Sequence, residues 1–135
     1  MKITFPHMGT SWIAIKTLVE GMGHEVVLPP PPTKRTLDLG TKYSPEFACL
    51  PFKVLLGTYL EALELGADTI ISSGGVGPCR AGYYTQLQGR ILREQLGYDV
   101  RVITFEPPRG HLIETYRIIR DLVKVSFPKF LACAW

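Results

Sequence analysis

The stretch DTIISSGGVGPCRAGYYTQLQGRILREQLG, residues 68–97, contains the three parts of one structural unit. Its first six residues, DTIISS, form a short apolar run that is typical of a strand. The last fifteen, which begin at Tyr83, predict a helix, and a glycine-rich loop that contains Cys79 lies between the two. The stretch therefore predicts a strand, a loop and a helix in this order.

The same order recurs along the rest of the chain. Strands are predicted near Ile3 and Phe5 and in residues 25–29 and 99–105, and helices in residues 10–23, 52–67 and 111–127. Strands that alternate with helices predict right-handed crossovers and a parallel sheet covered on both faces. We therefore expect an α/β fold, a three-layer αβα sandwich with a four-stranded parallel sheet in the order 2-1-3-4, flavodoxin-like or Rossmann-like.

One long segment does not fit this alternation. Residues 29–49, PPPPTKRTLDLGTKYSPEFAC, lie between the second predicted strand and the second predicted helix. Its prolines favour an extended chain, so we expect an irregular stretch there. Loops of this length in compact domains are usually functional or mobile, and the alternative is a stiff surface spacer.

Length and composition predict one domain. The chain has 135 residues, of which 46% are hydrophobic and 20% charged, and a net charge of +3, which favours neither nucleic acid nor a membrane surface as a partner. It has no apolar run of about 18 residues, and its N-terminus lacks the pattern of a signal peptide. We therefore expect a cytoplasmic protein with a single α/β domain over residues 1–135. The apolar end, PKFLACAW, favours an N-terminal fragment of a longer chain, and the alternative is a tail packed on its own domain.

Two of the three cysteines are predicted to meet. Cys49 precedes Pro51 at the start of the second predicted helix, and Cys79 lies between the third strand and its helix. In the order 2-1-3-4 the first and third strands are neighbours, and the functional crevice of such a sheet lies beyond the carboxyl ends of its strands. Both thiols are therefore expected at one crevice.

Two thiols that meet at this crevice could bind a metal or react with an electrophile. A helix N-terminus and Arg80 both favour the thiolate, which binds metals or attacks electrophiles. The glycines at 74, 75, 77 and 82 let backbone N–H groups point inward, as they do around cluster sulfurs and phosphates. From these residues alone, an iron–sulfur cluster, a reactive thiol and structural cysteines all stay open, because two cysteines thirty positions apart are not a cluster motif.

Several common sites are excluded by their missing motifs. The sequence has no GxGxxG fingerprint after its first strand, no GxxxxGK[ST] loop and no GxSxG elbow. The residue six positions after Cys79 is Thr85, where a phosphatase loop needs arginine. The third strand ends in Ser72 and Ser73, where a receiver domain needs aspartate.

Three segments together resemble a known family. FPHMGTSW, EFACLPFKVLLGTYLEALELGADTII and GGVGPCRAGYYTQLQGRIL are similar to the 2-hydroxyacyl-CoA dehydratase and benzoyl-CoA reductase superfamily, and within it to the CoA-enzyme activase-related proteins. The resemblance spans about residues 1–110, and its most specific parts are ACLPFK and GPCRAGYY. Members of that family are much longer than this chain.

The resemblance implies a cofactor and a partner. It makes Cys49 and Cys79 ligands of an iron–sulfur cluster, commonly [4Fe–4S], that passes low-potential electrons toward a CoA thioester or a similar substrate. It also implies a separate ATP-hydrolysing activase module. A third cysteine in the family comes from later in the chain, where only Cys133 remains, in an apolar setting more typical of core filler. We therefore expect the cluster to be absent or incomplete in this chain by itself.

Other polar groups are expected around the same crevice. We expect an anion or the phosphates of a CoA ester to be held by His7, Lys53, Gly75, Gly77, Arg80 and Arg109. The alternative for each charged residue is solvated surface. Tyr83 and Tyr84 open a helix, so one ring should pack inward while the other caps the pocket, and His24 is expected at the surface. The alternative function is a noncatalytic α/β domain that binds an anion or assembles with a partner.

Overall fold

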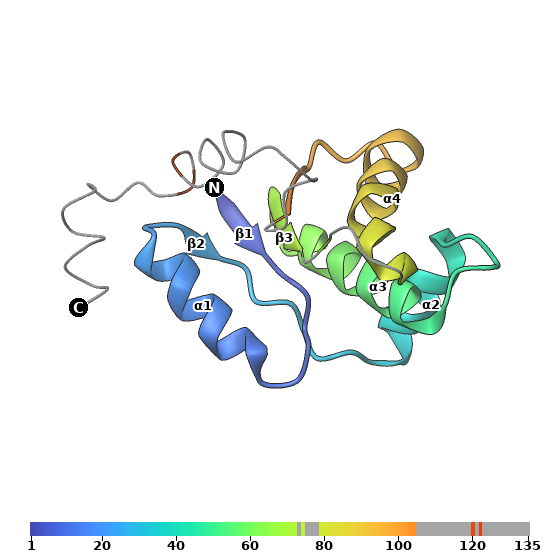
Figure 1. Ribbon diagram of the computed structural model, residues 1–135, viewed down its shortest axis with the longest axis horizontal. Coiled ribbons are helices and arrows are strands. Elements are labelled where there is room, and N and C mark those ends of the chain that lie inside the picture. The colour runs from blue at the N-terminus through green and yellow to red at the C-terminus, as the bar shows by residue number, and fades with distance from the viewer. Residues whose placement is uncertain (73, 75–78, 105–119, 121, 123–135) are drawn as a thin grey trace.

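The computed structural model describes residues 1–72, 74, 79–104, 120 and 122 (Figure 1). In chain order, these residues form β1 (Lys2–Thr4), α1 (Ser11–Gly21), β2 (Glu25–Val26), α2 (Lys34–Tyr43), α3 (Leu50–Glu64), β3 (Thr69–Ser72), the 3₁₀ helix η1 (Arg80–Tyr83), α4 (Tyr84–Arg90), the π-helical turn η2 (Ile91–Gln95) and β4 (Arg101–Thr104).

The predicted sheet is confirmed. Its four strands are all parallel and stand in the order β2-β1-β3-β4. The central strand β1 pairs with both neighbours at Ile3, which lies opposite Val26 on one side and Thr69 on the other. Because β1 and β3 are adjacent although distant in sequence, their carboxyl ends form the switch point of this fold.

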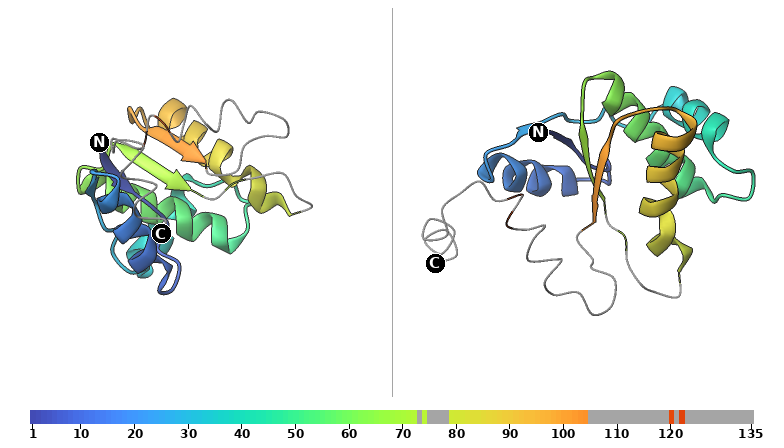
Figure 2. Two further views of the ribbon diagram at one scale, coloured as in Figure 1. Left: turned by 60° about the vertical axis from the view of Figure 1, so that its left-hand side comes forward. Right: turned by 90° about the horizontal axis from the view of Figure 1, so that it is seen from above.

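Helices cover both faces of the sheet, which gives the predicted three layers (Figure 2). One face packs against α1, and its buried core consists of Ile3, Val19, Ile71, Ile103 and Leu122. The other face packs against α3, α4 and η2, through a larger core that includes Phe52, Leu56, Tyr59, Ile70, Ile91 and Leu92. Ile70 and Ile71 are adjacent in β3 and point to opposite cores, because side chains alternate along a strand.

The expectation of an irregular stretch over residues 29–49 is wrong for residues 34–43. There the chain forms α2, and Thr33 caps it through a reciprocal pair of hydrogen bonds with Thr36. The four prolines that precede Thr33 remain outside any helix or strand. The prediction of a non-helical chain is therefore correct for the four prolines themselves. The capping pair of Thr33 and Thr36 that follows them starts a helix.

Two glycines explain how α2 lies so close to α3. A Cβ at Gly40 would stand 1.8 Å from the Lys53 carbonyl oxygen, and a Cβ at Gly57 would stand 1.9 Å from the Thr36 carbonyl oxygen. No side chain is possible at either position without moving a backbone. The two helices therefore pack backbone against backbone.

A buried carboxylate completes the contact between these helices. Glu61 of α3 is only 5% exposed and accepts a hydrogen bond of 2.7 Å from the Thr36 hydroxyl. Arg35 reaches from α2 to Glu61 at 3.9 Å and to Glu64 at 2.6 Å. Because a buried charge is costly unless it is paired and hydrogen-bonded, this contact specifies which face of α2 meets α3.

The C-terminal predictions fall mostly outside the described residues. The fourth predicted helix, residues 111–127, is described only at Arg120 and Leu122. Leu122 packs in the core on the α1 face, and its carbonyl accepts a hydrogen bond of 2.7 Å from His24 Nε2. His24 is 6% exposed, so the expectation of a surface histidine is wrong.

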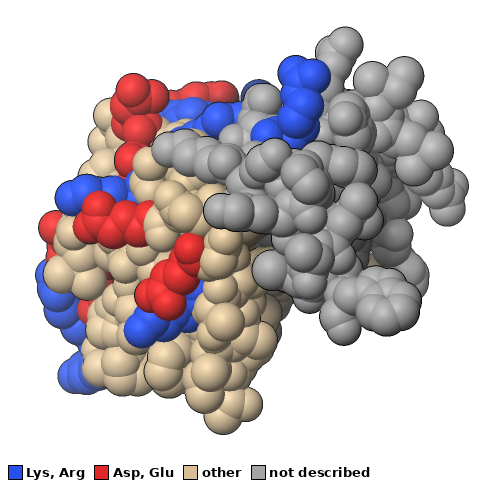
Figure 3. Space-filling model, turned by 90° about the vertical axis from the view of Figure 1, so that its left-hand side faces the viewer, with Lys and Arg blue, Asp and Glu red and all other residues tan. Residues whose placement is uncertain are grey.

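No helix of the described residues has the length and apolar character needed to cross a bilayer. Acidic and basic side chains are interspersed on the face shown in Figure 3. Ion pairs at 3.8 Å between Lys2 and Glu25 and at 3.7 Å between Lys16 and Glu20 illustrate this mixing.

Replacing Gly40 with alanine should destabilise the protein by at least about 2 kcal/mol, because the new Cβ would overlap the Lys53 carbonyl oxygen. Gly21→Ala is the matched control, since a Cβ there meets nothing within 4 Å and should stabilise the chain by roughly 0.4–1 kcal/mol. Urea unfolding of both variants measures the difference. Equal stability of Gly40→Ala and the parent chain would contradict the packing described above.

Asp68 should make stability depend on pH at the amino edge of the sheet. Although burial acts to raise the pKa of its carboxyl, hydrogen bonds from the Thr69 hydroxyl and the Lys2 amide outweigh burial and lower it. A lowered pKa means that this stabilisation is present above the ordinary value of about 3.9 and is lost as the pH falls below it.

Asp68→Asn should therefore remove part of the loss of stability that the parent chain shows on acidification. Urea midpoints measured at neutral pH and at several acidic pH values give the difference. Parallel pH profiles for the two proteins would show that Asp68 has no such role.

Candidate functional site

The candidate site lies beyond the carboxyl ends of β1 and β3. At this edge, β1 runs into the loop that leads to α1, and Ser72 ends β3 just before the glycine-rich segment. The start of α3 and the start of η1 carry the two predicted thiols. Open α/β sheets bind their ligands at this position.

Two contacts fix where the glycine-rich segment leaves the sheet. The buried Tyr59 hydroxyl of α3 donates a hydrogen bond of 2.8 Å to Ser72 Oγ. A Cβ at Gly74 would stand 2.8 Å from Thr85 Oγ1, so only glycine allows the chain to pass this closely under α4. Ser72 is thus held against α3, and Gly74 lies against α4.

Cys49 is the N-cap residue of α3, as its position before Pro51 predicts. Its backbone is extended, with φ of −70° and ψ of 159°, and its half-buried side chain makes no capping hydrogen bond. Instead Cys49 Sγ forms a hydrogen bond with the Tyr84 hydroxyl. The Tyr84 ring packs edge to face on Phe52, with 5.1 Å between ring centroids, and this contact holds the hydroxyl at the sulfur.

Electrostatics around this pair favour the thiolate. The hydrogen bond from the Tyr84 hydroxyl is the main cause that lowers the pKa of Cys49. Burial opposes it, while the backbone amide of Phe52 and the charge of Arg80 lower the pKa further. The same hydrogen bond, with burial and the nearby Cys49 and Cys79 thiolates, raises the pKa of Tyr84 to about 12.

Cys79 is the exposed N-cap residue of η1. It lies five residues before Tyr84, the first residue of α4, whose hydroxyl bonds to Cys49. The structure therefore places Cys49 and Cys79 at the same edge of the sheet. Whether they bind a metal stays a prediction.

The structure describes three of the residues that are predicted to bind an anion. Arg80 lines the site, and Lys53 follows in the first turn of α3 with its Nζ 3.5 Å from the Glu46 carbonyl oxygen. His7 lies in the loop after β1 and stacks on Trp12, with ring centroids 6.5 Å apart. The remaining predicted residues, Gly75, Gly77, Arg109 and Cys133, lie outside the described residues.

A pocket opens beside Cys49, and several of its lining residues were not predicted from the sequence. It has a volume of about 120 Å³, and Phe47, Ala48, Phe52 and Leu87 provide apolar walls. The two tyrosines lie as expected, since Tyr84 packs inward and Tyr83 lines the pocket while 55% exposed. The useful signal in the sequence was Phe47, a large apolar residue in the turn just before α3.

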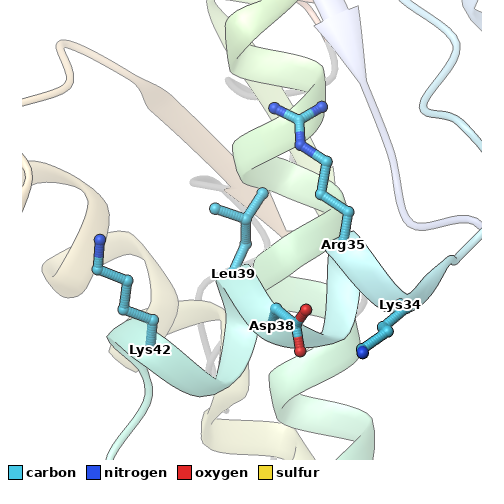
Figure 4. A pocket seen from close by; sticks show the side chains of 5 residues that line it. All are labelled: Lys34, Arg35, Asp38, Leu39 and Lys42. Carbon is cyan, nitrogen blue, oxygen red and sulfur yellow. The ribbon is translucent and has the colours of Figure 1, made fainter.

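A second concavity, of about 370 Å³, lies along the outer side of α2 (Figure 4). Its lining residues, Lys34, Arg35, Asp38, Leu39 and Lys42, all come from this one helix. Arg35 is already paired with Glu61 and Glu64, and Leu39 packs toward the core. We interpret this concavity as the solvated face of α2.

Comparison of the chain with protein-family models, curated proteins and solved structures gave no match.

Tyr84→Phe should raise the pKa of Cys49, because it removes the hydroxyl that donates to the thiolate. The pH dependence of Cys49 alkylation by iodoacetamide measures this, in a background that carries Cys79→Ser and Cys133→Ser. Tyr83→Phe is the matched control and should leave the profile unchanged. An unshifted profile for Tyr84→Phe would show that the hydrogen bond does not control this thiol.

Proposed function

We propose that this chain is an iron–sulfur redox component related to the 2-hydroxyacyl-CoA dehydratases and their activase-related proteins. The observation that carries the proposal is the pair of thiols at the carboxyl edge. Cys49 is hydrogen-bonded by Tyr84 in a way that favours the thiolate, and Cys79 begins the next helical segment along the chain. Thiolates at neighbouring element starts, next to a glycine-rich segment, suit iron and sulfide.

The donor set fits part of a cluster site. A [4Fe–4S] cluster usually takes four protein ligands, and no group of three or more His, Cys, Asp or Glu side chains in the described part of the chain could hold a metal ion. Cys49 and Cys79 would therefore supply two ligands. The others would have to come from residues outside the described ranges or from another chain.

The surrounding residues have definite roles in this proposal. When bound, the cluster would supply one-electron transfer at a low potential. The Tyr84 hydroxyl would donate to the Cys49 sulfur, and Arg80 would offset negative charge at the same place. Both interactions would stabilise negative charge on the cluster. They would therefore raise its reduction potential relative to a site that lacks them.

The remaining parts of the system would be separate molecules. The sequence lacks the GxxxxGK[ST] loop, so an ATP-hydrolysing activase partner would supply the energy. A CoA thioester is the substrate class that the family resemblance implies. Arg80 and Lys53 lie at the edge where its phosphates would approach.

One observation favours the alternative, a noncatalytic α/β domain that assembles with a partner. Three large apolar side chains near the thiols are exposed: Phe47 by 77%, Leu50 by 61% and Tyr83 by 55%. Grouped exposed apolar side chains often mark an interaction surface. Such a surface would need neither iron nor a thiolate.

Anaerobic reconstitution with iron and sulfide should give a brown protein whose iron content falls strongly in Cys49→Ser and in Cys79→Ser. Serine is nearly isosteric with cysteine, so each variant should lose less than about 1.5 kcal/mol of stability while it loses a ligand outright. Lys42→Gln, on the separate face of α2, is the control and should keep its iron, while Cys133→Ser tests whether the remaining cysteine is a ligand. Iron content and melting temperature are measured for all four variants.

Two results would contradict the cluster. A parent chain that takes up no iron even when an added thiol stands in for the missing protein ligands would reject it directly. Unchanged iron in Cys49→Ser and Cys79→Ser, together with a clear fall in their melting temperatures, would return both cysteines to a structural role.

A further inference from the structure

The pocket beside Cys49 has the size of a small ligand. Its volume of about 120 Å³ is comparable to engineered protein cavities of about 150 Å³ that bind benzene. Its walls come from three places in the chain: Phe47 and Ala48 before α3, Phe52 within α3, and Leu87 in α4. A cavity built by separate elements of the fold is a preformed site for one ring or one short branched chain.

An exposed cation beside this pocket favours an anion. Arg80 is the one basic side chain among the described residues that line it, and no described acidic residue forms an ion pair with Arg80. The fifteen-residue helix α3 begins at the pocket, with no capping side chain and no acidic residue in its first turn. This positive end of the helix dipole therefore adds positive potential on the same side.

We propose that this pocket binds a small organic carboxylate with an apolar body of about four to seven carbons. The apolar body lies between Phe52 and Leu87, and the carboxylate lies against Arg80 and the first turn of α3. Arginine is suited to this role because its planar guanidinium binds a carboxylate through two parallel hydrogen bonds. The bound molecule covers the Cys49 thiol, which lines the same pocket.

This inference does not require the iron–sulfur proposal. The pocket, Arg80 and the start of α3 exist in the chain without iron, so the test uses the full 135-residue chain free of iron. A failure to assemble a cluster and a failure to bind a carboxylate are then separate results.

Titration with benzoate and with 3-methylbutanoate, followed by saturation-transfer NMR at constant ionic strength, tests binding directly. At least one of the two acids should bind saturably. Benzamide, which keeps the ring without the charge, and acetate, which keeps the charge without the apolar body, should bind at least about tenfold more weakly. The acid that binds should also slow the alkylation of Cys49 by iodoacetamide without slowing that of exposed Cys79.

Two variants locate the site. Arg80→Gln should weaken binding about tenfold or more, because it removes the charge that pairs with the carboxylate. Ala48→Leu should abolish binding by filling the pocket from a loop position. Lys42→Gln is the control, since Lys42 is a cation on the separate face of α2, and it should leave the affinity unchanged.

The proposal is overturned if neither acid binds, or if benzamide binds as tightly as benzoate. It is also overturned if Arg80→Gln and Ala48→Leu both fold, as judged by thermal melting, and bind the acid like the parent chain. Because Arg80 is exposed, its variant should fold even if Ala48→Leu does not.

Discussion

The backbone contact between α2 and α3 is the constraint on which the rest of this structure depends. Gly40 and Gly57 let the two helices approach until each backbone lies against a carbonyl of the other. The Thr36 hydroxyl and Arg35 then satisfy the buried Glu61 carboxylate. Since a close contact of this kind tolerates no side chain, it fixes the position of α3 along α2, and it covers the outer side of the larger core.

The position of α3 determines the chemistry at the carboxyl edge. Its first turn places Cys49 at the hydroxyl of Tyr84, and its interior places Tyr59 at the end of β3. The edge-to-face contact of Phe52 with Tyr84 connects α3 to α4 at the same level. A thiol, a phenol and the start of the glycine-rich segment are therefore all held by one helix, whose burial along most of its length stabilises this arrangement.

One physical property of this edge supports both the metal and the carboxylate proposals. The positive end of α3 and the guanidinium of Arg80 favour negative charge there, whether the charge is on a thiolate of the protein or on a carboxylate of a ligand. The apolar walls of the adjoining pocket strengthen such interactions by excluding water. The same features that favour a thiolate at Cys49 thus also make its surroundings a site for an organic anion.

The sequence by itself determined the order of strands and helices, because apolar periodicity is a property of neighbouring residues. That order in turn determined the parallel sheet and the shared edge of Cys49 and Cys79, because a strand that is followed by a helix packed back on the sheet returns as a parallel strand. The sequence did not show α2, because the buried residues of that helix are Thr36 and Gly40, small residues that do not mark a buried helix face in a sequence. Nor could it show that Tyr84 bonds to Cys49, or that His24 is buried. Those facts depend on side chains from distant segments that meet only when the helices pack on the sheet, so only the tertiary structure decided them.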